Sequence, residues 1–96
     1  MASVRFHPAA QAELLEAESW YRSRSAMAAR AFRTEAATII SELAENPMRW
    51  PPRTGLIRRA VLLRFPYSVI YRIDSDGVFV IAVAHQARKP DYWKKR

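Results

Sequence analysis

The chain contains no cysteine, so disulfides, thiol catalysis and thiolate metal sites are excluded. Its two glycines and two histidines form neither a glycine-rich phosphate loop nor a paired-histidine metal motif. No segment approaches the roughly 20 apolar residues of a membrane span, and Glu13, Glu16 and Glu18 interrupt the N-terminal stretch where a signal peptide would need an apolar core. We therefore expect a cytoplasmic protein that uses no metal or other cofactor and does not act at a membrane.

Acidic residues are scarce in the second half of the chain. Residues 1–48 carry five Arg or Lys and six Glu, a net charge of −1, whereas residues 49–96 carry eleven Arg or Lys and three Asp, a net charge of +8, which together give the total of +7. This asymmetry indicates a near-neutral half that packs and a cationic half that contacts an anionic target. The alternative is that the charge serves only solubility, although an even distribution would serve it equally well.

Two amphipathic helices are predicted in the first half of the chain. Residues 8–24 have apolar side chains at helical spacing, and Pro8 suits the first turn of a helix. Residues 26–46 show the same spacing, with Ser25 as the N-cap and Pro47 ending the helix. The predicted core positions are Ala10, Leu14, Ala17 and Tyr21 in the first helix, and Met27 or Ala28, Phe32, Ala36, Ile39, Ile40 and Leu43 in the second. Charges interpreted as complementing the dipole of the first helix are Glu13, Glu16, Arg22 and Arg24.

A sheet is predicted on either side of these helices. A short strand at residues 3–6 precedes them, and three apolar, β-branched strands follow at residues 56–63, 67–73 and 78–85. A Phe-Pro pair and an Asp-Ser-Asp-Gly turn separate the last three strands and make two successive hairpins. The order is β-α-α-β-β-β. We expect one α+β domain over residues 1–96, with a helical hairpin packed on a mainly antiparallel four-stranded sheet.

The last predicted strand is apolar on both faces, which indicates a central position in the sheet. Strict alternation places His85 on the same face as Ile81 and Val83. Because the ordinary pKa of histidine lies near neutrality, His85 is a candidate for general acid–base catalysis. The alternative is that His85 closes the apolar face and is bonded to the backbone. His7, which precedes Pro8, is interpreted as part of the helix start.

Aromatic residues mark a proline-rich connector and a basic C-terminal tail. Trp50, within residues 48–54, is interpreted as a packed lid over the open end of the helical hairpin, with base stacking as the alternative. The tail, residues 86–96, combines five Lys or Arg with Tyr92 and Trp93, a pattern typical of nucleic-acid binding. The alternative is that Tyr92 and Trp93 anchor the tail on the sheet while its lysines are solvated.

Three segments of the sequence are distinctive: Ser19-Trp20-Tyr21 near the end of the first helix, RFPYSVIYRI at residues 64–73 and VAHQARKPDYW at residues 83–93. Together with the order of elements, they resemble the RelE/ParE toxin superfamily over nearly the whole chain. Its members are the toxins of bacterial type II toxin–antitoxin pairs, often labelled plasmid stabilisation proteins. The resemblance implies a small basic toxin that a cognate antitoxin neutralises in a toxin–antitoxin hetero-oligomer.

The superfamily contains two mechanisms. RelE-like members are endonucleases that cut mRNA in the ribosomal A site, and ParE-like members bind DNA gyrase and trap it on DNA. The ribonucleases depend on a cluster of basic side chains, often with a C-terminal tyrosine, which must orient the 2′-OH and stabilise charge developing on the phosphate. A third possibility is a basic RNA-binding or interaction module that is not toxic.

The ribonuclease set is incomplete in this sequence. By resemblance, Arg59 matches one basic site of the RelE type, and Tyr92 lies about where that type has its tyrosine. At other positions where that type has basic residues, this chain has Val61, Ser68 and Gln86. This favours ParE-like inhibition of DNA gyrase over enzymatic RNA cleavage, for which the candidate catalytic residues are Arg59, His85 and Tyr92. The residues expected to contact the target or the antitoxin are Arg58, Arg59, Arg64, Arg88, Lys89, Tyr92 and Trp93.

Overall fold

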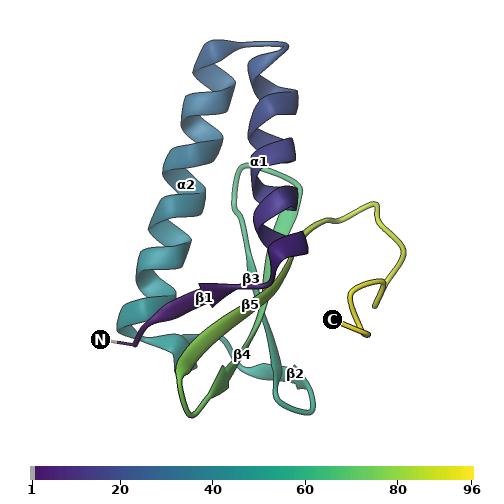
Figure 1. Cartoon of the computed structure of the whole chain (residues 1–96). Helices are drawn as coiled ribbons and strands as arrows, with labels where there is room; N and C mark the ends of the chain where they lie inside the picture. The colour runs from purple at the N-terminus through teal and green to yellow at the C-terminus, as the bar shows by residue number, and fades with distance from the viewer. Residues whose placement is uncertain (1) are drawn as a thin grey trace.

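The computed structural model describes residues 2–96 and has two layers, a helical hairpin and a five-stranded sheet (Figure 1). The helices are α1 (Pro8–Arg22) and α2 (Ala26–Glu45), and the strands are β1 (Val4–Phe6), β2 (Pro52–Thr54), β3 (Ile57–Val61), β4 (Tyr67–Asp74) and β5 (Gly77–His85). The sheet order is β1-β5-β4-β3-β2, in which β1 pairs with β5 in parallel and the other neighbours are antiparallel. The expected α+β class, the helical hairpin and the interior position of β5 are confirmed.

The sheet has one strand more than the sequence analysis predicts. The additional strand, β2, lies in the proline-rich segment that was expected to be only a connector, directly after the short 3₁₀ helix η1 (Pro47–Arg49) and Trp50. It pairs with β3 in an irregular register between Pro52 and Thr54. Because proline has no backbone N–H to donate, such a strand is restricted to the edge of a sheet, which is where β2 lies.

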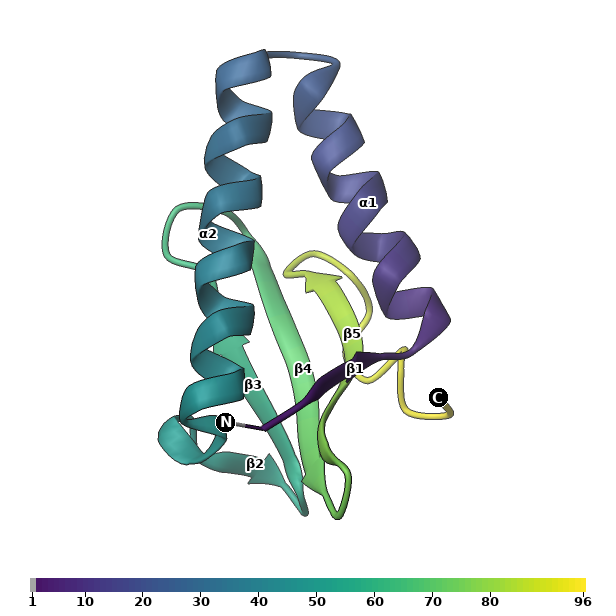
Figure 2. The same cartoon turned by 60° about the vertical axis from the view of Figure 1, so that its left-hand side comes forward.

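Both helices begin at the predicted residues, Pro8 and Ala26. His7 precedes α1 and accepts the backbone N–H of Ala9 on its Nδ1 at 3.0 Å. Ser25 precedes α2 and accepts the N–H of Ala28 on its hydroxyl oxygen at 3.2 Å. The hairpin that the two helices form projects beyond the end of the sheet (Figures 1 and 2). In the described part of the chain, residues 2–96, no helix has the length and apolar character needed to cross a membrane.

The main core lies between the hairpin and the sheet. Phe32 of α2 and Tyr71 of β4 are completely buried, and the Tyr71 hydroxyl donates a hydrogen bond to the Pro47 carbonyl oxygen at 2.7 Å. The predicted core positions of the helices are buried or half-buried apart from Met27, which is 83% exposed. Ala29 is buried instead, two positions further along α2. This core holds the hairpin against one face of the sheet.

A β-bulge changes which side chains of β5 face the helices. The pairing of β4 with β5 shifts by one residue in mid-strand, where Ile81 is an extra residue in β5. Val80 and Val83 therefore both pack in the core beneath the helices, whereas Ile81 and Ala82 both pack on the opposite face. The strict alternation predicted for this strand is wrong. His85 does not share a face with Ile81; it lies with Val83 beside α1.

The opposite face of the sheet is covered by residues 86–96, which we call the C-terminal strap. Trp93 of the strap is 8% exposed and packs in a second apolar cluster with Ile70, Ile81 and Ala82. Tyr92 is partly buried against the same cluster. Of the two interpretations of the tail, anchoring by its aromatic residues is therefore confirmed. The strap folds back toward the sheet beyond the end of β5, and it ends near the start of α1 (Figure 2).

Candidate functional site

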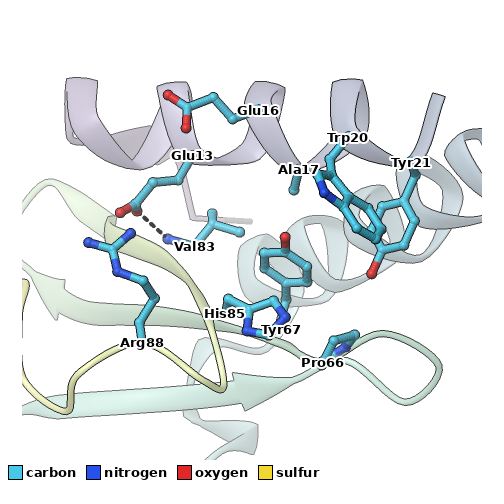
Figure 3. Close-up of a pocket in the computed structure, with 10 residues that line it drawn as sticks. All are labelled: Glu13, Glu16, Ala17, Trp20, Tyr21, Pro66, Tyr67, Val83, His85 and Arg88. Atoms are coloured by element: carbon cyan, nitrogen blue, oxygen red, sulfur yellow. Dashed lines mark hydrogen bonds between the residues drawn. The ribbon is translucent and has the colours of Figure 1, made fainter. Parts of the chain in front are cut away.

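The end of β5 brings together several of the predicted site residues. Two hollows flank it, and His85 and Arg88 line both. The hairpin-side hollow has a volume of about 490 Å³ and lies between α1 and the sheet (Figure 3). The strap-side hollow has a volume of about 200 Å³ and lies between the C-terminal strap and the opposite face of the sheet. These two hollows form the candidate functional site.

The hairpin-side hollow has mainly apolar walls and a charged rim. Figure 3 shows side chains of α1 pointing across it toward Tyr67, Val83 and His85. The remaining apolar wall residues are Ala17, Trp20, Tyr21 and Pro66, and the charged ones are Glu13, Glu16 and Arg88. Burial raises the pKa of Tyr67, and the neighbouring Tyr21 adds to that shift. The hollow therefore suits an apolar side chain of a partner better than it suits charge.

His85 is held by two contacts at the boundary between the hollows. Its ring meets the ring of Tyr67 edge-on, with centroids 5.0 Å apart. Its Nδ1 accepts the backbone N–H of Ala87 at 3.0 Å, which leaves Nε2 as the ring nitrogen that can carry the proton of the neutral form. This is the backbone-bonded arrangement that the sequence analysis gave as the alternative to a catalytic histidine.

The strap-side hollow is predominantly cationic. Arg59 enters it from β3, and Arg88 and Lys89 enter it from the strap. Ser68 and Gln86, the neutral residues that the resemblance places where a RelE-type ribonuclease has basic ones, also line it. The remaining lining residues are Ala84, His85, Pro90, Asp91, Tyr92 and Trp93. The structure thus brings together Arg59, Ser68, Gln86 and Tyr92, as the resemblance implies, but two of these four residues are neutral substitutions.

Glu13 of α1 fastens the strap. Its carboxylate accepts the backbone N–H of Val83 at 3.0 Å and the Tyr92 hydroxyl at 2.7 Å. It also accepts two N–H groups of the Arg96 guanidinium, one on each oxygen, at 2.9 Å each. Burial raises the pKa of Glu13, but the hydrogen bonds from Arg96, Tyr92 and Val83 outweigh it and hold the pKa below its ordinary value. The carboxylate is therefore ionised at neutral pH.

The Tyr92 hydroxyl is committed to this network. Burial and its hydrogen bond to Glu13 raise the pKa of Tyr92 to about 12, so the hydroxyl stays protonated and donates to the carboxylate. The Arg88 guanidinium lies 3.9 Å from the centre of the Tyr92 ring, on its face. Tyr92 therefore connects the fastening carboxylate to a cation of the hollow, and its hydroxyl would have to leave Glu13 before it could act on a substrate.

Two of the predicted contact residues lie outside both hollows. A guanidinium N–H of Arg58 donates to the Trp50 carbonyl oxygen at 2.5 Å, and the Trp50 ring packs edge-on against Tyr71. Trp50 is therefore a packed lid, as predicted. Arg64 lies 3.8 Å from a carboxylate oxygen of Glu35 on α2. Neither arginine joins Arg59 at the end of β5.

Glu13 and Arg96 were missed as site residues by sequence reasoning. We interpreted Glu13 as a partner of the helix dipole, and this is wrong, because the first turn of α1 contains no acidic residue and the dipole effect falls off beyond that turn. The only signal in the sequence for another role of Glu13 was its position among apolar neighbours on α1. No three His, Asp or Glu side chains among residues 2–96 lie together as a metal site would require.

Comparisons with known proteins agree with this architecture. A chain of a solved structure described as "Chromosomal ParDE TA system from P. aeruginosa" superposes with a TM-score of 0.74 and 18% sequence identity, covering 88% of this chain and 96% of that chain. At that identity the likeness shows a shared fold. Among curated proteins, none matches this chain.

The sequence itself defines the family more sharply. Residues 4–90 match the family model described as "ParE toxin of type II toxin-antitoxin system, parDE". The chain therefore belongs to the ParE toxin family, within the superfamily that its motifs resemble. The match ends before Tyr92, Trp93 and Arg96, so the fastened end of the strap lies beyond the segment by which the family is identified.

Proposed function

We propose that this chain is the toxin of a type II toxin–antitoxin pair, that it inhibits DNA gyrase, and that a cognate antitoxin neutralises it. The observation that carries the proposal is the family match over residues 4–90. The proposed toxin acts by binding and not by catalysis. In support, the Tyr92 hydroxyl is already bonded to Glu13, and Ser68 and Gln86 bring no charge to the strap-side hollow.

The antitoxin we propose is a protein with an acidic and partly apolar segment. The apolar walls of the hairpin-side hollow can accept side chains of such a segment, and the cations at the end of β5 attract its carboxylates. Co-expression with the product of a neighbouring open reading frame is the direct test. A stable complex that restores growth is expected, and a cognate pair that fails to associate would contradict this part of the proposal.

The gyrase proposal is tested by inducible expression with separate measurements of DNA replication and translation. We expect growth to stop and replication to fail first. With purified protein, gyrase should lose supercoiling activity and cleaved gyrase–DNA complexes should accumulate. Normal growth in the presence of folded, soluble protein would contradict the toxin assignment and favour a non-toxic basic module.

Ribosome-dependent mRNA cleavage is the second candidate, because the strap-side hollow has Arg59, His85, Arg88 and Lys89 around it. Arg88 and Lys89 could stabilise charge on a phosphate, and the bond from Ala87 to Nδ1 of His85 leaves its Nε2 available. Under this candidate, Arg59→Ala and His85→Ala should reduce codon-phased cutting in a translating extract by about 10²-fold or more. Such cutting, with gyrase unaffected, would reverse the preference.

A further inference from the structure

A half-buried cation in the strap-side hollow lacks an acidic partner. Arg59 is half-buried on the face of the sheet that the strap covers, yet it forms no ion pair with any residue of the described chain 2–96. Asp91 also lines the hollow, but its carboxylate does not approach Arg59 within ion-pair distance. Because partial desolvation of a cation without a counter-charge is unfavourable, Arg59 is available to an anion that is supplied from outside.

The hollow has the composition of a phosphate site. Arg59, Arg88 and Lys89 provide guanidinium and ammonium groups, and Ser68 and Gln86 provide neutral donors. Arginine is well matched to phosphate because its planar fork can donate two parallel N–H bonds to phosphate oxygens. A volume of about 200 Å³ admits a phosphate group with its adjoining oxygens and excludes a base pair. Arg88 and Lys89 are exposed on the strap, so the hollow is open to a long ligand.

The strap supplies most of the polar groups of this site, and Glu13 holds the strap in place. Two of the three strongly basic groups, Arg88 and Lys89, lie on the strap between β5 and Tyr92. Tyr92 and Arg96 hold the far end of that segment on Glu13, and Arg88 stacks on the Tyr92 ring. If the carboxylate were removed, the strap would keep Trp93 in its apolar cluster but would lose three hydrogen bonds from its own side chains.

We propose that the strap-side hollow binds a backbone phosphate of DNA, and that Glu13 is the residue that positions the strap for this contact. The inference rests on the proposed function, because a toxin that traps gyrase on DNA would be bound next to the DNA backbone. Glu13 does not touch the phosphate. It acts through Tyr92 and Arg96, which fix the course of residues 86–96 and so the distance of Arg88 and Lys89 from Arg59.

The test is binding of the full-length purified protein to a fluorescent 20-base-pair DNA duplex between 50 and 200 mM NaCl, about the range over which phosphate contacts change affinity strongly. Arg59→Gln should weaken binding and reduce the slope of log affinity against log salt by about 1, the value for one lost phosphate contact. Arg30→Gln is the matched control, since Arg30 is an exposed arginine of α2 that lines neither hollow. It removes the same charge and should weaken binding less.

The effect of Glu13→Gln on DNA affinity has opposite signs under the two explanations, positioning of the strap and simple charge attraction. It raises the net charge of +7 by one, so attraction alone predicts tighter DNA binding. We expect weaker binding, by about fivefold or more, with a smaller salt slope, because the strap cations lose their position. Tyr92→Phe leaves the net charge unchanged and should weaken binding in the same direction. It serves as the second variant if Glu13→Gln does not fold, and thermal unfolding by circular dichroism checks that each variant is folded at the assay temperature.

Several results would overturn the inference. These are no salt-dependent DNA binding by the wild-type chain, equal effects of Arg59→Gln and Arg30→Gln, and tighter binding by Glu13→Gln. Displacement of the duplex by inorganic phosphate at an equal concentration of phosphate groups would indicate a site for small phosphates and would also overturn it. A parallel supercoiling assay keeps the two proposals apart: inhibition of gyrase without DNA binding refutes only the phosphate site, and DNA binding without inhibition refutes only the gyrase proposal.

Discussion

Glu13 and Arg96 lie 83 positions apart in the sequence and are joined by two parallel N–H···O bonds of 2.9 Å each. Their side chains are 13% and 18% exposed, so this is the most enclosed of the ion pairs of residues 2–96. The Arg96 guanidinium also donates to the Ile81 carbonyl oxygen at 3.1 Å, beside the β-bulge. The pair therefore ties α1, the bulge in β5 and the C-terminus at one point.

Removing either partner of this pair should destabilise the fold more than removing an exposed one. Arg96→Ala leaves Glu13 partly buried with fewer donors, and we expect a loss of about 1.5–3 kcal/mol in the free energy of unfolding. Arg22→Ala, which removes the 58%-exposed partner of Glu18 on the surface of α1, is the control and should cost less than about 1 kcal/mol. Urea unfolding monitored by circular dichroism measures both. Equal losses would show that the pair does not fasten the strap.

The Tyr92 hydroxyl should titrate well above the ordinary pKa of tyrosine. Burial and donation to Glu13 raise the pKa of Tyr92 to about 12, since deprotonation would place a second anion against the carboxylate. Because this pKa lies above its ordinary value of 10.0, the associated stability is present below pH 10 and is lost as pH rises toward 12. Absorbance at 295 nm, compared between the wild type and Tyr92→Phe, should show one missing transition near pH 12. A missing transition near pH 10 would contradict the network.

Low pH should also weaken the hydrogen-bond network of Glu13, Tyr92 and Arg96, because it protonates the Glu13 carboxylate. The pKa of Glu13 is lowered, because hydrogen bonds from Arg96, Tyr92 and Val83 outweigh the opposing effect of burial. A carboxylate with a lowered pKa stabilises the fold above its ordinary value of 4.5, and the stabilisation is lost as pH falls through the folded-state pKa. The gap in Tm between the wild type and Glu13→Gln should therefore be wide at neutral pH and close in strong acid. A gap that does not depend on pH would show that Glu13 acts through packing and not through its charge.

The sequence predicted the helices and strands well because those signals are local. The helical spacing from Pro8 to Tyr21 and the cap at Ser25 fix the hairpin without reference to the sheet. The turns before and after β4 are likewise determined by residues that are adjacent in the sequence. Arg88 and Lys89 were candidates because of their charge, and Arg59 because of its charge and the resemblance to RelE-type toxins; all three line one hollow in the structure. The sequence therefore predicted the helices, the strands and about half of the site residues.

The features that were missed depend on pairing between distant segments. The bulge at Ile81 lies in a continuous run of apolar residues with no glycine to mark it, so alternation could not reveal it. The fastening role of Glu13 depends on where the last residue, Arg96, returns in space, which no local pattern encodes. Arg58 and Arg64 look like Arg59 in sequence, and only the fold separates them from the hollow.

Gly77, the first residue of β5, tests the parallel pairing of β1 with β5. It adopts a φ of +117°, and a Cβ at this position would lie 2.5 Å from the backbone oxygen of Ser3, which itself accepts the N–H of Val78 at 2.8 Å. Backbone cannot yield as a flexible side chain can, so Gly77→Ala should push β1 away from β5. Together with the strained φ, we expect a loss of about 3 kcal/mol or more.

Gly55→Ala is the matched control for this position. Gly55 also has a positive φ, +58°, but a Cβ there would meet nothing within 4 Å, so only the backbone conformation is strained. The expected loss is about 1–2 kcal/mol, the cost of a left-handed conformation for a residue with a side chain. Thermal or urea unfolding of the two variants gives the comparison, and hydrogen exchange of the β5 amides reports the release of β1 directly. Equal losses, with β5 amides equally protected, would mean that the contact with Ser3 relaxes at no cost.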